Sequence, residues 1–149
     1  MQLRSLPLLL LFASVAFGGG LEEPVVLDLH TGGMPGSHEF HVQLLSTGHL
    51  TVIHRRLPVT SKGLTESRHE IDLSPESVNE LLSLAAESDD FSQGCNLVAD
   101  GTTASLSAVR GKERFERSCA NAPHWPVGPK TIRLLEVLNK SLPGEFKVF

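Results

Sequence analysis

The chain contains seven histidines, and imidazole binds zinc and copper and acts as a general base near neutral pH. Two of them stand in "HEFH", where His38 and His41 are one residue short of the HExxH spacing of helical zinc proteases. The segment alternates like a strand, in which that motif cannot work. Pairing it with the next strand about Thr47-Gly48 places His41 opposite His54, a pair that could hold zinc or copper.

Two imidazoles without a cysteine or carboxylate in reach fall short of a metal site. We therefore predict no metal centre and no cofactor, and His41 and His54 are the candidate ligands that come nearest to one. The same pairing places Glu39 opposite Arg56 and puts Phe40 and Ile53 on the other, buried face. A slip of one residue would move both histidines to the other face, because side chains alternate along a strand.

The two cysteines, Cys95 and Cys119, lie near the ends of one stretch. If that stretch were a three-strand meander, they would be roughly 9–10 Å apart across the sheet and roughly 13 Å along it. A disulfide requires Cα atoms within about 7 Å. If residues 89–101 are instead a loop, as their composition indicates, Cys119 ends a hairpin strand beside Thr102, and Cys95 can reach it. We predict a Cys95–Cys119 disulfide, and the absence of a CxxC motif argues against a redox role.

Other catalytic patterns are missing from the sequence. It contains no GxSxG, no phosphate-binding glycine loop and no EF-hand spacing, so we predict no catalytic residue and no enzyme activity. Trp125 is expected to fill the junction between sheet and helix, since a single aromatic makes no sugar-stacking platform. Asp89 and Asp90 follow a predicted helix, where the helix dipole disfavours them, and a frayed end is expected there.

The N-terminus predicts a signal peptide over residues 1–18, cleaved after Ala16 or Gly18. Its apolar run, Leu6 to Phe17, is shorter than the roughly 20 residues that span a bilayer, so no membrane anchor is expected after cleavage. The protein is then secreted or periplasmic, where thiols pair. Losing Arg4 leaves 12 Lys and Arg against 17 Asp and Glu, a net charge of −5, which argues against a nucleic-acid partner.

The remaining chain, residues 25–149, predicts a single α+β domain. Its order is βββ(β)-α-ββ-α, giving an antiparallel sheet of about five to six strands with two helices packed on one face. Ser74-Pro75 predicts the first helix start and Gly128-Pro129 the second. The expected strands are 24–31, 38–45, 49–57, 67–73, 102–109 and 112–119. The expected inward positions are Val78, Leu81, Leu82 and Ala85 in the first helix, and Ile132, Leu134, Leu135, Val137, Leu138 and Leu142 in the second.

Three segments carry a resemblance to known proteins: "LSPESVNELLSLAAESDDF", "DGTTASLSAVRGKERFE" and "APHWPVGPKTIRLLEVLNKSL". Their succession resembles small uncharacterised bacterial exported α+β domains, and its rhythm is similar to emfourin-type metalloprotease inhibitors. The likeness covers residues 73–142 and rests on Ser74, Pro75, Asp100 and Gly101. It implies a fold, and it carries no inhibitory residue onto a position of this chain.

Two functions follow as hypotheses. The first is a non-catalytic protein-binding or accessory module, protease-inhibitor-like in one version, whose partner is another exported protein. Its candidate contact is a flexible loop formed by Gly32, Gly33, Met34, Pro35 and Gly36. The alternative is a small histidine-dependent metal-binding protein or hydrolase that uses His41, His54 or His69.

Overall fold

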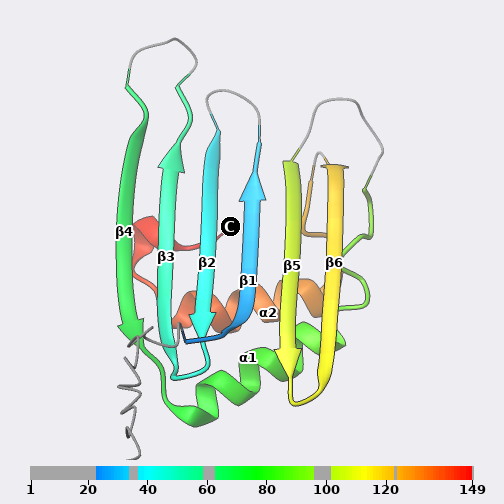
Figure 1. Ribbon diagram of the computed structural model, residues 1–149. Coiled ribbons are helices and arrows are strands. Elements are labelled where there is room, and N and C mark those ends of the chain that lie inside the picture. Colours follow the sequence, from blue (N-terminus) through cyan, green and yellow to red (C-terminus); the bar gives the residue numbers. More distant parts are fainter. Residues whose placement is uncertain (1–22, 34–36, 59–62, 96–101, 123, 149) are drawn as a thin grey trace, which may run out of the picture.

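A computed structural model describes residues 23–33, 37–58, 63–95, 102–122 and 124–148 (Figure 1). The predicted signal peptide (1–18), the loop residues Met34, Pro35 and Gly36, and the turn Asp100-Gly101 lie outside these ranges. In the part of the chain that is described, no helix is long and apolar enough to cross a membrane.

Six strands form one antiparallel sheet, as predicted, and the structure places them in the order β4-β3-β2-β1-β5-β6. β1 therefore lies in the interior of the sheet, between β2 and β5, and β4 and β6 are its edges (Figure 1). The strands are β1 (Val25–Gly32), β2 (His38–Leu45), β3 (His49–Arg56), β4 (Thr65–Asp72), β5 (Thr102–Arg110) and β6 (Glu113–Ala122).

Two helices, α1 (Pro75–Glu87) and α2 (Pro129–Lys140), pack on one face of the sheet and leave the other face open (Figure 1). A short 3₁₀ helix, η1 (Gly144–Phe146), follows α2. The core lies between the sheet and the helices, where Leu29, Val42 and Leu106 are almost fully buried. The predicted α+β architecture is confirmed. We call the two sides of the sheet the helix face and the open face.

The start of α1 follows the predicted pattern. The Ser74 hydroxyl accepts a hydrogen bond from the Ser77 backbone N–H at 3.2 Å, and Pro75 occupies the first helical turn. In α2 one predicted inward position is wrong, because Ile132 is 38% exposed. Thr131 is fully buried in its place, since its hydroxyl is fixed by a hydrogen bond to Asp90.

Asp90 caps the start of α2 from outside that helix. Its Oδ2 accepts from the backbone N–H of Lys130 at 2.8 Å, and its Oδ1 accepts from the backbone N–H of Thr131 at 3.0 Å and from the Thr131 hydroxyl at 2.7 Å. Gly128, at the N-cap position, has no side chain to do this, and a Cβ there would overlap Asp90. The frayed end predicted for Asp89 and Asp90 is therefore wrong. The two residues join the exit of α1 to the entry of α2.

We expect Asp90→Asn to lower the free energy of unfolding at pH 7 by about 1 kcal/mol, because the amide nitrogen cannot accept the hydrogen bond that one carboxylate oxygen accepts and the negative charge at the start of α2 is lost. Burial alone would raise the pKa of Asp90. The hydrogen bonds from Thr131 and Lys130 outweigh it, so the pKa lies below its ordinary value. The carboxylate's contribution is thus complete above about pH 4–5, and it is lost as the pH falls through that lowered pKa.

Denaturant unfolding of both proteins from about pH 2 to 7 tests this expectation. The stability of the natural protein should fall more steeply in acid than that of Asp90→Asn. Asp89→Asn is the control, because Asp89 only accepts from the exposed Lys130 ammonium at 2.8 Å, and it should change little. Parallel pH curves for the natural protein and Asp90→Asn would contradict the capping role.

Candidate functional site

The register of β2 with β3 differs from the predicted one by one residue. His41 lies opposite Ile53, Phe40 lies opposite His54, and Glu39 lies opposite Arg55. The cause is the connecting turn, which has three residues, Ser46–Gly48, with Gly48 at a φ of 93° in place of a two-residue turn. The predicted pairings of His41 with His54 and of Glu39 with Arg56 are therefore wrong, and Ile53 shares the face of His41 and not the buried face of Phe40.

His41 lies on the open face, next to carboxylates. Its Nε2 is 3.2 Å from Oδ1 of Asp28. The other carboxylate oxygen of Asp28, Oδ2, accepts a hydrogen bond from the Gln43 amide at 2.9 Å. The neighbouring His30 Nε2 is 2.8 Å from Oε1 of Glu39. These histidines take part in a surface network of polar side chains. Exposed pairs of this kind contribute little to stability individually.

His54 lies on the helix face, within a stack of rings. Its ring lies parallel to Phe40 with centroids 4.5 Å apart, and its Nε2 is 2.6 Å from Nδ1 of His38. Burial lowers the pKa of His54, the neighbouring His38 lowers it further, and Glu145 offsets this only in part. The uncharged form of the His54 imidazole is therefore favoured. One ring of the pair then donates its N–H to the other.

Beside this stack lies a cavity of about 590 Å³, which we call the sheet-end cavity. It opens where β1 and β3 end and where β2 and β5 begin, with η1 forming one side. The Ser37 hydroxyl on its wall is buried and has no hydrogen-bond partner among the described residues. The cavity is lined by Gly33, Ser37, His38, Phe40, His54, Thr102, Gly144, Glu145 and Lys147.

The sheet-end cavity brings together residues that the sequence placed in different hypotheses. Gly33 belongs to the predicted contact loop, and His54 belongs to the predicted histidine pair. His38, from the HEFH segment, takes the place of His41 beside His54. Within the ranges that the structure describes, no three His, Cys, Asp or Glu side chains converge as ligands of a metal ion. His69 packs against Phe146, with ring centroids 5.3 Å apart, and the ring of Phe146 is also 6.5 Å from that of His54.

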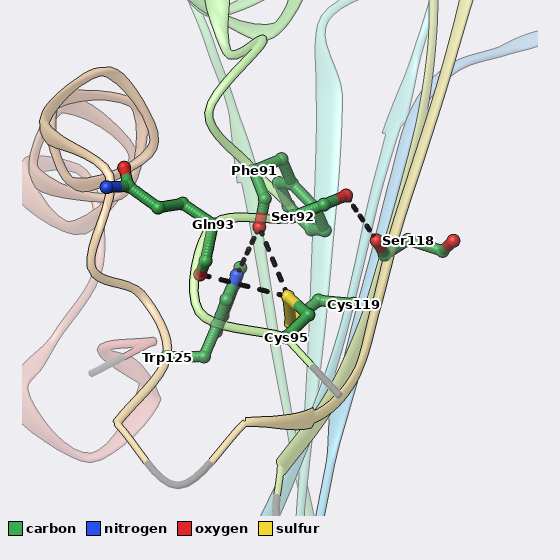
Figure 2. Close-up of a disulfide and its surroundings, with 7 residues drawn as sticks. All are labelled: Phe91, Ser92, Gln93, Cys95, Ser118, Cys119 and Trp125. Atoms are coloured by element: carbon green, nitrogen blue, oxygen red, sulfur yellow. Dashed lines mark hydrogen bonds between the residues drawn. A yellow bond between two sulfur atoms is a disulfide. The ribbon is translucent and has the colours of Figure 1, made fainter. Parts of the chain in front are cut away.

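The disulfide also lies on the helix face, near the β6 edge of the sheet, where the exit of α1 meets β6 (Figure 2). Cys95 and Cys119 are bonded, with Cα atoms 5.3 Å apart, as predicted. β6 continues to Ala122, so Cys119 pairs with Ala104 and does not end the strand. The loop that carries Cys95 also packs on Trp125, whose indole N–H donates to the Phe91 carbonyl at 2.8 Å. Trp125 is 4% exposed and fills the junction as predicted.

Comparison with known proteins gives no family. No family model and no curated protein matches the chain. Among solved structures, the chain is similar to one from "Crystal structures of trypanosoma bruciei MRP1/MRP2". The two are 16% identical over 80% of this chain and 86% of that chain, with a TM-score of 0.30. A likeness at this level carries no argument about this protein.

Proposed function

We propose that the protein is an exported, non-catalytic binding module that holds an extended segment of another exported protein in the sheet-end cavity. The cavity itself carries this proposal. Its volume of about 590 Å³ lies within the range of about 300–1,000 Å³ typical of ligand sites. Its walls come from strand ends and η1, which are held by the sheet and the core.

The chemistry of the cavity wall fits a peptide. The stacked rings of Phe40 and His54 offer an apolar surface, on which a side chain of the partner can pack. The unpartnered Ser37 hydroxyl can bond to a backbone amide or carbonyl of that segment. Glu145 and Lys147 supply one charge of each sign at the rim. The surface thus combines an apolar contact with polar groups that fix orientation.

Export is supported by two independent features. The N-terminal sequence has the composition of a signal peptide, and the Cys95–Cys119 bond is of a kind that persists in oxidising compartments. The resemblance to emfourin-type inhibitors implies an exported protease as one partner of this kind.

We expect Gly144→Trp to abolish peptide binding without unfolding the protein. Gly144 lines the cavity, and a Cβ there meets no atom within 4 Å, so the indole has room to occupy the cavity. Peptides selected from a displayed random library on the natural protein are the probe. They should bind Gly144→Trp at least tenfold more weakly in titration calorimetry, while Gly144→Ala, the matched control, retains their affinity.

Equal melting temperatures of the three proteins establish that neither substitution damages the fold. If no peptide is selected, or if the selected peptides bind Gly144→Trp as tightly as the natural protein, the cavity is not the binding site.

A further inference from the structure

The outer edge of β6 has unpaired backbone groups. Within the described residues, β6 is an edge strand that pairs with β5 alone. The two-residue turn after Arg110 makes Arg110 and Glu113 a hydrogen-bonded pair, so alternate residues direct their backbone groups away from β5. These are Arg114 and Glu116. In agreement, the Glu116 carbonyl accepts from the Arg117 guanidinium at 3.0 Å and not from a strand.

Only the first half of this edge is open. The Ser118 carbonyl accepts from the hydroxyl of Ser92 at 2.5 Å, so the disulfide-bonded loop covers the edge from there on. Figure 1 shows this loop, in green, alongside the later part of β6. The open stretch is residues 113–117, and its sequence is "ERFER".

When the order of residues 113–117 is reversed, as in an antiparallel pairing of the stretch with itself, each charged residue is matched with a residue of opposite charge. We propose that β6 pairs antiparallel with β6 of a second copy of this chain, centred on Phe115. Glu113 then lies opposite Arg117 of the second copy, and Arg114 lies opposite Glu116 of the second copy. Each pairing occurs twice because the contact is two-fold symmetric. The result is one continuous sheet across both chains.

This register satisfies the geometry of an antiparallel ladder. Arg114 and Glu116 become hydrogen-bonded pairs across the contact, since their backbone groups point outward. The two Phe115 rings meet as a closely spaced pair on the helix face, where the ring now lies 5.8 Å from the Arg110 guanidinium carbon and 6.0 Å from that of Arg117. Shifting the centre to Arg114 or Glu116 would place two like charges directly opposite each other, which is destabilising.

The contact is short, about five residues a side, so a weak dimer with a dissociation constant between about 10 µM and 1 mM is expected. Sedimentation velocity of the full exported chain over that concentration range is the test. Arg114→Glu and Glu116→Arg each set like charges opposite one another at two positions. Each variant should dimerise at least about tenfold more weakly than the natural protein.

Two further samples separate strand pairing from a general effect of charge. An equal mixture of Arg114→Glu and Glu116→Arg should form heterodimers. In a heterodimer, positions 114 and 116 are acidic in one chain and basic in the other, so residues of opposite charge face each other at both positions. The double variant R114E/E116R should recover the natural dissociation constant. Thermal melting establishes that all variants are folded, as expected for exposed side chains. A natural protein that stays monomeric to about 1 mM, or a mixture that does not associate, overturns the proposal.

The contact is independent of the sheet-end cavity. Gly144→Trp should therefore dimerise like the natural protein. The dimer proposal is tested by sedimentation alone, so a failure of the peptide-binding proposal does not contradict it.

Discussion

Replacing both Cys95 and Cys119 with alanine is expected to lower the free energy of unfolding by about 2–5 kcal/mol, the usual cost of losing a native disulfide in a small exported domain. The bond joins residues separated by 24 positions, so it limits the freedom of the unfolded chain. It also anchors the loop whose Phe91 carbonyl receives the Trp125 indole. At roughly 3–6 °C per kcal/mol, the melting temperature should fall by about 6–30 °C.

Alkylation followed by mass spectrometry checks the bond itself. The natural protein, isolated without reductant, should take up no alkyl group before reduction and two after it. Ser92→Ala is a useful comparison, because it removes a hydrogen bond from the same loop and leaves the disulfide intact. Two alkyl groups taken up before reduction would show that the bond does not form.

Trp125→Ala is expected to destabilise the protein by about 3–5 kcal/mol, the range for a buried large aromatic residue. The Trp125 ring packs edge-on against Phe91 with centroids 5.0 Å apart, and Phe91 is fully buried. The residue therefore fixes the loop before β5 against the segment that leads into α2. Chemical denaturation followed by circular dichroism measures the loss.

Trp125→Phe is the matched control. It keeps much of the ring and removes the N–H that donates to the Phe91 carbonyl, so a smaller cost of about 1–3 kcal/mol is expected. If Trp125→Ala costs less than about 1 kcal/mol, the junction is not a structural contact of this fold.

The elements that local sequence determines were predicted well. Ser74-Pro75 and Gly128-Pro129 begin helices as expected, because a cap and an N-terminal proline act within one turn. The disulfide was predicted from a geometric conflict, since a three-strand meander would hold Cys95 and Cys119 too far apart.

The errors arose where the local sequence allows two turns or where a distant residue decides the outcome. Ser46-Thr47-Gly48 is compatible with a two-residue or a three-residue turn, and the choice moves His54 to the other face of the sheet. The orientation of α2 depends on Asp90, which precedes it by many residues. Two features of the sequence could have indicated this cap. Gly128 offers no capping side chain to α2, and the helix dipole disfavours Asp90 at the end of α1.

The sheet-end cavity could not be predicted as a unit. Gly33 and His54 were each identified as candidates, in different roles. Their proximity depends on the β2–β3 register and on the path of the chain after α2, which brings Gly144 and Lys147 to the same place. The residues near Gly33 or His54 alone determine neither that register nor that path.

The interior position of β1 sets the order in which the chain can fold. β2, β3 and β4 form a local meander, β5 and β6 form a local hairpin, and only β1 pairs with both groups. Leu29 must find Leu106 across most of the chain, and such long-range pairing slows folding. Because the chain is made from its N-terminus, β1 must therefore wait for β5 before the sheet is complete. The Cys95–Cys119 bond joins residues within the later half, so oxidation can proceed before the two halves meet.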